Sequence, residues 1–368
     1  MCPRKCEVAD MNRLKNMKRT TKANFATYLG VILAFVIVTI LVNNGMLKRS
    51  HMGLLVPICC YIVMAVSLNL TVGILGELSL GHAGFMSVGA FSGVVAAMGL
   101  QSAIPSEPLR LAIALVVGAA FAAMAGAIVG VPVLRLRGDY LAIFTLAFGE
   151  IIKELINCLI VGVDSQGLHL IFNATGTKGV NDLGLLEGGK VLIKGAQGAT
   201  GTQTIASFTA GFILIMVSLV VVLNLVRSRS GRAIMALRDN RIAAESVGIN
   251  VTKYKLMAFV TSAALAGAAG ALYGLNFSNL VATKFDFNTS ILVLVFVVLG
   301  GLGNIWGSIL AATVLTILPE ALRGFDDYRM LIYAVVLILV MLATNNPQLK
   351  ALLAKLIPHS RKGEEANA

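Results

Sequence analysis

The chain has 368 residues, of which 57% are hydrophobic and only 13% are charged. Soluble domains average roughly 25% charged residues, so this composition excludes an ordinary soluble protein and indicates that lipid is the solvent. In lipid, only helices and closed barrels satisfy their own backbone hydrogen bonds. The sequence lacks the short alternating segments of a barrel, so we expect an all-α integral membrane protein.

The net charge of +12 is concentrated in three stretches. Residues 1–22, residues 227–255 and the tail from Lys350 together hold 18 of the 30 lysines and arginines, and each stretch borders a hydrophobic segment. Basic residues beside a membrane span mark its cytoplasmic side. The charge therefore predicts membrane topology, with both termini cytoplasmic, and does not indicate a nucleic-acid surface.

Apolar segments that predict membrane helices lie near 25–44, 53–73, 80–100, 110–133, 140–161, 205–227, 256–275, 290–319 and 328–344. Starting inside, the first six return the chain to the cytoplasm at the second basic stretch. The segment 290–319 must then cross twice or not at all, and glycines interrupt it, so we expect two short half-helices meeting at a break. The prediction is a polytopic bundle of about 8–10 transmembrane helices with at least one glycine-broken segment.

The domain boundaries follow from these segments. A basic cytoplasmic tail covers residues 1–24, the transmembrane domain covers 25–345, and a second cytoplasmic tail covers 346–368. Within the transmembrane domain we expect an external loop at about 163–204 and a cytoplasmic loop at about 228–255. The external loop is long for an unstructured connection, and it either folds over the outer mouth or is mobile.

The first polar motif lies in the run Leu75–Ala90, where Glu77, Ser79 and His82 interrupt apolar residues. Ionisable residues at membrane depth are costly and often face a cavity or pathway. Ser79 and His82 are therefore candidates for a translocation path. The alternative is that both residues only join helices by hydrogen bonds.

The second motif lies in the expected fifth span, where Thr145 and Glu150 enter the membrane. Both are candidates for the translocation path. Lys153 follows Glu150 by one helical turn, at a spacing that allows an ion pair. A structural ion pair is therefore the alternative interpretation of Glu150.

A nucleotide site is excluded by the sequence. The run Gly184–Lys190 has the spacing of a phosphate-binding loop, but Val191 stands where a hydroxyl would hold magnesium, and no strand–turn–helix pattern surrounds it. No hydrolase motif or paired-cysteine metal spacing occurs. We expect no catalytic residue, no metal site and no bound cofactor, so any energy from ATP must come from a partner.

The cytoplasmic stretch Ser228–Lys255 is the most informative segment. Apolar residues at 234, 237, 242, 247 and 249 predict a short amphipathic helix with a small-residue patch, ended by Gly248. A short basic helix can lie on the anionic inner membrane surface. It can equally fit a groove on a cytoplasmic partner, and the residues alone leave both interpretations open.

The last motif is the run Gly300-Gly301-Leu302-Gly303-Asn304. A glycine-interrupted hydrophobic segment is the best sequence indication of a transporter's translocation site, so Gly300, Gly301, Gly303 and Asn304 are candidates for the path. A tight turn between two helices is the alternative. The preceding segment Ala263–Gly274 presents a small-residue face that predicts close helix packing.

Four segments, in this order, resemble the permease subunits of bacterial branched-chain (hydrophobic) amino-acid ABC importers, specifically the longer, M-type permease. They are LNLTVGILGELSLGHAGFMSVGA, LRLRGDYLAIFTLAFGEI, SRSGRAIMALRDNRIAAESVGINV and VVLGGLGNIWGS. Together they are spread over most of residues 65–320, and the combination is far more specific than any one segment. The resemblance is weaker over residues 1–24, the loop 163–204 and the C-terminal tail.

The resemblance implies that the cytoplasmic segment docks in a groove of an ATPase. The docking residues that match are Arg232, Arg238, Asp239, Ala243, Ala244, Glu245 and Gly248. It also implies a second related permease subunit, two ABC ATPase subunits that use ATP and Mg²⁺, and an extracytoplasmic substrate-binding protein.

The function implied by the resemblance is ATP-driven import of branched-chain or related hydrophobic amino acids across a prokaryotic inner (plasma) membrane by alternating access. Urea and short amides are alternative substrates in the same family. A proton-coupled secondary transporter is a second alternative, and its sign would be inverted repeats with matching broken segments. The segments 72–90 and 295–307 give only a weak indication of such a pair.

Overall fold

The computed structural model describes residues 27–42, 44, 49–101, 103–134, 138–164, 167–173, 183, 189–322, and 331, 332, 334, 335 and 338. It divides into two compact units, Met1–Ala312 and Thr313–Ala368. The predicted tails 1–24 and 346–368 lie outside the described residues.

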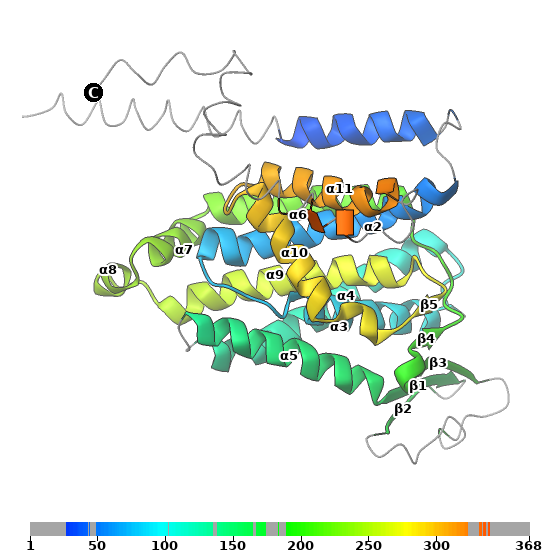
Figure 1. Cartoon of the computed structure of the whole chain (residues 1–368). Helices are drawn as coiled ribbons and strands as arrows, with labels where there is room; N and C mark the ends of the chain where they lie inside the picture. Colours follow the sequence, from blue (N-terminus) through cyan, green and yellow to red (C-terminus); the bar gives the residue numbers. More distant parts are fainter. Residues whose placement is uncertain are drawn as a thin grey trace, which may run out of the picture. The chain divides into compact units, whose positions relative to one another are not determined.

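Helices make up most of the first unit (Figure 1). They are the helix Thr27–Val42, α2 (Arg49–Leu68), the π-helix η1 (Asn69–Leu75), α3 (His82–Gly99), α4 (Glu107–Val133), α5 (Asp139–Asn157), the short η3 (Gly195–Gln197), α6 (Phe208–Arg227), α7 (Arg229–Asp239), α8 (Arg241–Ser246), α9 (Val251–Gly274), the short η4 (Ala282–Phe285), α10 (Phe287–Gly300) and the beginning of α11 (Ile305–Ala321). The segment predicted at 290–319 is confirmed as two short helices, α10 and α11, joined by the turn 301–304.

Five of the described helices are long and apolar enough to cross a membrane, namely Met52–Leu75, His82–Gly99, Glu107–Val133, Phe208–Arg227 and Val251–Gly274. Three apolar helices are shorter: Thr27–Val42, α10 and α11. The helix α5 has 19 residues but is less apolar, because it carries Asp139, Glu150, Lys153 and Glu154. The predicted polytopic helical bundle is confirmed.

The helix α2 continues without a break into η1, and all seven residues of this π-helix are buried. Gly76 ends η1 in the left-handed conformation, with φ of 79°, which residues with a Cβ rarely adopt. The chain is then non-helical until α3 begins at His82. The stretch from Gly76 to Gly81, which contains Glu77 and Ser79, therefore separates two helices.

The stretch predicted as an external loop is partly folded into strands. It contains β2 (Gly167–Phe172), β3 (Lys190–Lys194) and β4 (Ala199–Thr200). The strand β1 (Leu159–Asp164) begins before it, and β5 (Asn279–Leu280) joins them after α9. All pairs are antiparallel, in the order β2-β1-β3-β4-β5. The sequence did not predict this small sheet, and the fifth span ends at Asn157 rather than near 161 because the chain enters β1.

The helix α9 is the centre of the core, because α2, α3 and α4 all pack on it. A Cβ added at Gly267 would lie 2.6 Å from the Gly118 carbonyl oxygen of α4. A Cβ added at Gly89 of α3 would overlap the backbone of Gly267. Three helix backbones therefore meet here without intervening side chains, which confirms the close packing predicted from the small-residue face.

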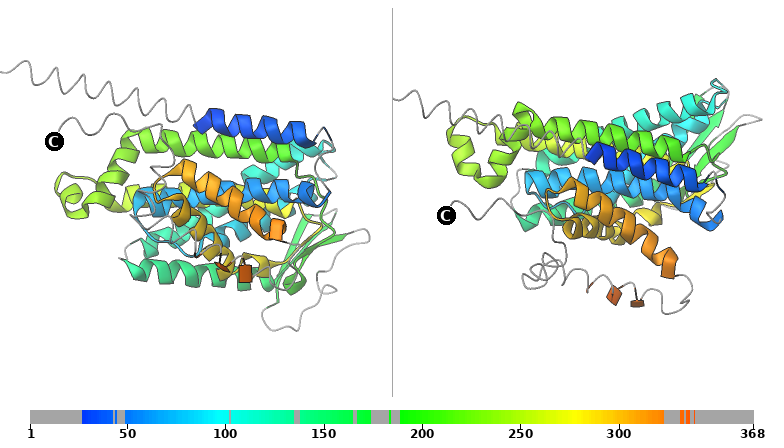
Figure 2. Two further views of the ribbon diagram at one scale, coloured as in Figure 1. Left: turned by 45° about the horizontal axis from the view of Figure 1, so that its top comes forward. Right: turned by 90° about the horizontal axis from the view of Figure 1, so that it is seen from above.

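Two groups of elements outside the long helices mark the opposite ends of the first unit. The helices α7 and α8 are at one end and the strands are at the other, in Figure 1 and in both views of Figure 2. Between these ends, α4, α6 and α9 border an apolar cavity of about 680 Å³. Its wall includes Leu115, Ile213 and Ala264.

The second unit begins at Thr313, inside α11. Beyond α11, its described residues include helical positions at 331, 332, 334, 335 and 338. The side chains of Leu331, Val335 and Ile338 are exposed. The last predicted span, 328–344, is described only at these positions.

We predict that Gly267→Val destabilises the protein, because its new side chain would collide with α4. Overpacking of this kind typically costs roughly 1–3 kcal/mol. The measurement is the melting temperature of the detergent-solubilised protein, followed by fluorescence-detected size exclusion. Ala264→Val, on the same helix but beside the cavity, should melt close to wild type. Equal melting temperatures for the two variants would contradict the close backbone contact.

Candidate translocation and docking sites

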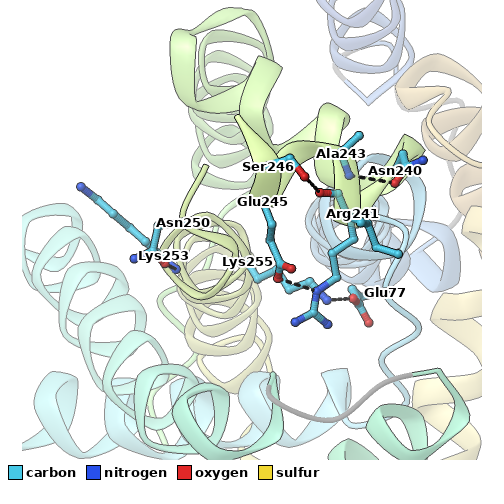
Figure 3. Close-up of polar contacts among 10 residues, drawn as sticks. Glu77, Asn240, Arg241, Ala243, Glu245, Ser246, Asn250, Lys253 and Lys255 are labelled. Atoms are coloured by element: carbon cyan, nitrogen blue, oxygen red, sulfur yellow. Dashed lines mark hydrogen bonds and ion pairs between the residues drawn. The ribbon is translucent and has the colours of Figure 1, made fainter. Parts of the chain in front are cut away.

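A capping side chain and a glycine define the two ends of α8 (Arg241–Ser246). Asn240 precedes it in extended conformation, and its Oδ1 accepts a hydrogen bond from Ala243 N at 3.1 Å (Figure 3). Such a cap satisfies a backbone donor at the helix start. After the helix, Gly248 adopts φ of 84°, and Asn250 caps α9 through Lys253 N at 3.1 Å. Two asparagines and one glycine thus set the turn between α7 and α9.

A small apolar core holds α8 against its neighbours. Leu237, Ala244 and Val251 are buried together, and Ala236, Ile249 and Tyr254 pack against them. Ala244, a predicted docking residue, therefore lies inside this core and does not belong to the exposed face, because it fills the contact between α7 and α9. The helix α8 therefore projects from the helical bundle but is held in place by this core.

The outer face of α8 is exposed and mixed in character. Ile242 is 77% exposed and Val247 is 76% exposed, while Ala243 and Glu245 are also exposed between them. The Glu245 Oε1 atom lies 3.1 Å from Arg241 Nε, one turn earlier (Figure 3). Apolar side chains of this size on a short projecting helix are typical of an anchor for a groove in another protein.

The other predicted docking residues lie on α7 and differ in their surroundings. Arg232 and Asp239 are exposed. Arg238 is also exposed, with 48% of its side chain accessible, and its Nε lies 3.7 Å from Asp239 Oδ1, while its Nη1 donates a hydrogen bond to the Gly73 carbonyl oxygen of η1 at 2.8 Å. Arg238 therefore contacts η1 rather than only presenting a surface to a partner.

An ion pair between Lys255 and Glu77 joins the start of α9 to the segment after η1 (Figure 3). The Lys255 side chain is 6% exposed and the Glu77 side chain is 18% exposed. Removal of one partner would leave the other charge buried without compensation, which is strongly unfavourable. The sequence marked Glu77 as unusual but did not predict its partner, 178 residues away.

His82 is the first residue of α3 and is 2% exposed. Its Nε2 lies 2.8 Å from the Ser67 Oγ atom of α2, and the Ser67 carbonyl oxygen accepts a hydrogen bond from Ser262 Oγ of α9 at 2.5 Å. These contacts tie three helices together. The geometry favours the helix-joining interpretation of His82.

Thr145 connects α5 to the chain just before α3. Its Oγ1 accepts a hydrogen bond from Leu80 N at 3.1 Å and donates one to the Ala142 carbonyl oxygen at 2.9 Å. On the other side, Ala83 N donates to Ser290 Oγ, in the first turn of α10, at 3.2 Å. The beginnings of α3 and α10 therefore meet beside the middle of α5.

Glu150 and Lys153 form the predicted ion pair on α5. The Glu150 side chain is 37% exposed and borders a narrow cleft of about 10 Å³, a volume near the minimum for one water molecule. The cleft is lined by Leu80, Gly84, Leu146, Gly149, Glu150, Phe285, Asp286, Phe287 and Ser290. Nearby in sequence, Ser79 is buried and its Oγ has no hydrogen-bond partner among the described residues.

The structure thus brings Ser79, His82, Thr145 and Glu150 to one region, here called the α3–α5–α10 seam and defined by Ser79–Gly84, Thr145–Glu150 and Phe285–Ser290. The remaining path candidates, Gly300, Gly301, Gly303 and Asn304, do not belong to it. They form the turn between α10 and α11, so the tight-turn interpretation holds for their local structure.

This turn contacts the end of α2. Asn69 of η1 accepts a hydrogen bond from Gly303 N on its Oδ1 at 2.8 Å and donates one from Nδ2 to Ser308 Oγ at 3.0 Å. Gly301 and Gly303 have φ of 91° and 81°, so glycine is required at both. The glycine break predicted in 290–319 therefore lies beside the π-helix η1.

Sequence reasoning missed several residues that hold these regions together. Asn69, Ser67 and Ser290 are buried polar residues in apolar runs, and that contrast was the available signal. Lys255 carried a similar signal, as a charge four residues into an apolar helix. Their partners are distant in sequence, so no local pattern indicated them.

A comparison with protein families shows to which family the chain belongs. Residues 50–341 match the family model described as branched-chain amino acid transport system / permease component. The chain belongs to this family. It is therefore a multi-pass membrane permease subunit of the ABC importer class, and its family is a transport family rather than an enzyme family.

Named relatives agree with this assignment. The permease is 35% identical over 337 residues to the high-affinity branched-chain amino acid transport system permease protein LivM of Salmonella typhimurium, covering 87% of this chain and 75% of the relative. The Escherichia coli LivM protein is 34% identical over the same shares. The LivH permease of Salmonella typhimurium is 27% identical over 45% of this chain and 55% of LivH. No solved structure matches the chain.

The run that mimics a phosphate-binding loop has a different local structure. Residues 184–188 lie outside the described residues, but Lys190 begins the strand β3. A phosphate-binding loop leads into a helix, whose start holds the phosphates. The structure following this run is therefore incompatible with that motif.

We predict that Lys255→Met lowers the stability of the permease by about 3 kcal/mol or more, because it leaves Glu77 partly buried without its partner. Thermal unfolding in detergent measures the effect. Lys253→Met, at an exposed position in the first turn of the same helix, should change the melting temperature little. The double change Glu77→Lys with Lys255→Glu should recover part of the loss, and no recovery would argue against the pair.

Proposed function

We propose that this permease translocates branched-chain or related hydrophobic amino acids inward, as the membrane subunit of an ATP-driven importer. The observation that carries the proposal is the family match over residues 50–341. The relatives with 34–35% identity are named as branched-chain amino acid permeases, and this supports the substrate class. The chain itself performs no bond chemistry.

The proposed energy source is a pair of ABC ATPases that dock on α8. The exposed Ile242 and Val247 supply apolar contact area, and Glu245 supplies a charged contact. Because the core of Leu237 and Ala244 braces α8, a force on α8 is carried into α7 and α9. The α7–α8 turn and both termini are proposed to be cytoplasmic, which the basic residues of 1–22, 227–255 and the tail from Lys350 support.

A second permease of the same family is the proposed membrane partner, because the LivH permeases are related to this chain over part of its length. The charged α5 face is suited to that contact or to an aqueous path, since Glu150 is 37% exposed and Glu154 is 67% exposed. Charges exposed directly to hydrocarbon are unfavourable. An external binding protein would deliver substrate at the end that carries the strands.

The translocation path is proposed to run along the α3–α5–α10 seam. Two helices begin at this seam, and helix N-termini carry partial positive charge that suits a substrate carboxylate. Glu150 carries the opposite charge, which suits an ammonium group. In the conformation described here the cleft of about 10 Å³ is too small for an amino acid, as expected for a closed stage of alternating access.

We predict that the purified wild-type complex contains two ATPase subunits, a second permease and this chain, and that Gly248→Trp loses the ATPases but retains the second permease. The new indole would project from the α8 end, where a Cβ has open space around it. The measurement is co-purification from native membranes in mild detergent. Glu245→Ala should weaken ATPase recovery less.

The matched control is Gly201→Trp. Gly201 has φ of 72° and an open environment like Gly248, but it lies at the opposite end of the unit beside β4. Both variants share the same backbone strain, so only loss of ATPases with Gly248→Trp supports docking at α8. If wild type purifies alone and moves solute in proteoliposomes without ATP, the importer proposal fails and a proton-coupled transporter replaces it.

A further inference from the structure

The end of α7 is directly connected to the end of α2. Arg238, the residue before the last one of α7, donates to the Gly73 carbonyl oxygen at 2.8 Å. Its aliphatic stem lies on Gly76, where an added Cβ would be 2.7 Å from Arg238 Cγ. The side chain thus contacts both the last turn of η1 and the left-handed glycine that ends it.

The Gly73 carbonyl is available because η1 stops at Leu75. Carbonyl groups in the last turn of a helix lack partners within the helix, and a cation near this end is favoured by the helix dipole. A guanidinium donor to a carbonyl is a charge-assisted hydrogen bond, stronger than a neutral one. Arg238 therefore serves as the cap of this π-helix from a different element.

The other end of η1, at Asn69, contacts the α10–α11 turn. Asn69, its first residue, holds Gly303 N and Ser308 Oγ with its amide group. A Cβ on Gly303 would lie 3.4 Å from the Gly73 carbonyl oxygen and 3.9 Å from Arg238 Nη1. The same carbonyl is therefore adjacent to the turn and bonded to α7.

The segment immediately after η1 is held by a different helix. Glu77 pairs with Lys255 in the first turns of α9, and α9 is fixed in the core by α2, α3 and α4. The last turn of η1 is therefore attached to α7 through Gly73, and the residues just after η1 are attached to α9 through Glu77. Single-turn π-helical segments are frequent at functional sites, and this one is placed where a shift of α7 relative to α9 would change it.

We propose that Arg238 is the positioning residue that transmits displacement of α7 and α8 to η1, and from η1 through Asn69 to the α10–α11 turn. This inference rests on the proposed function, because an ATPase docked on α8 supplies the displacement. Since α10 begins at the α3–α5–α10 seam and ends at this turn, the connection links the docking end to the seam.

The test uses the complete importer in proteoliposomes with its external binding protein. ATP hydrolysis and ATP-driven uptake of radiolabelled leucine are measured on the same preparation of Arg238→Met. We expect leucine uptake per ATP hydrolysed to fall about tenfold relative to wild type, which corresponds to the loss of about 1.4 kcal/mol from one charge-assisted bond. Arg238→Lys retains a charged donor and should recover most of the ratio.

The matched control is Arg229→Met, in the first turn of the same helix. Arg229 is exposed and has no hydrogen bond or ion pair among the described residues, so its uptake per ATP should equal that of wild type. A wild-type ratio in Arg238→Met overturns the inference and leaves the proposed function intact. Equal falls in hydrolysis and uptake, without recovery by lysine, also overturn it, because they indicate a structural role.

A second variant tests the inference if the importer that carries Arg238→Met does not assemble. Gly76→Ala retains the guanidinium but places a Cβ 2.7 Å from Arg238 Cγ, which displaces the side chain from η1. A lower ratio of uptake to hydrolysis supports the inference, and an unchanged ratio overturns it. If the wild-type importer takes up leucine without ATP, the proposed function itself is wrong, and this outcome is distinct from the others.

Discussion

The close backbone contact around Gly267 is the constraint on which the rest of the first unit depends. In lipid, helices gain little from hydrophobic burial against each other, so van der Waals packing and hydrogen bonds must hold them together. The meeting of Gly89, Gly118 and Gly267 brings α3 and α4 onto α9. The serine and histidine bonds between α2, α3 and α9 are then short enough to form.

Because this centre is rigid, the non-helical segments around it keep fixed neighbours. Two non-helical segments lie beside this tightly packed core. One lies between η1 and α3, and the other lies between α10 and α11. Backbone groups of these segments are satisfied by Asn69 and Thr145 from distant elements, and Arg238 satisfies a carbonyl in the last turn of η1. Interrupted helices in a membrane are tolerated only where such partners or a water-filled cavity replace the missing backbone bonds.

Much of the helical architecture could be predicted from the sequence, because long apolar runs and glycine spacing are local signals. The two short helices at 290–319, the small-residue face of α9 and the Glu150–Lys153 pair all follow from residues close together. The sheet could not be predicted, since β5 comes from after α9 and pairs with a two-residue strand. The family resemblance identified the docking segment, whereas its residues alone left two interpretations.

The sequence indicated which residues belong to the candidate site but not how they are arranged. Polar residues in apolar runs marked Ser79, His82 and Thr145 correctly as unusual, but the sequence did not separate the seam from the α10–α11 turn. The direction of Arg238 also could not be inferred, because a basic helix on the cytoplasmic side is equally consistent with an outward guanidinium. Only the fold shows that α7 and η1 are neighbours.

The pairing of β4 with β5 has a mechanical consequence. Ala199 faces Leu280 and Thr200 faces Asn279, so the chain entering α6 is fastened to the chain leaving α9, and β1 fastens the end of α5 to the same sheet. These helices share a fulcrum at that end. Because α9 is held by α2, α3 and α4, a force on α5 or α6 at the other end would tilt these two helices about the sheet rather than slide them along α9.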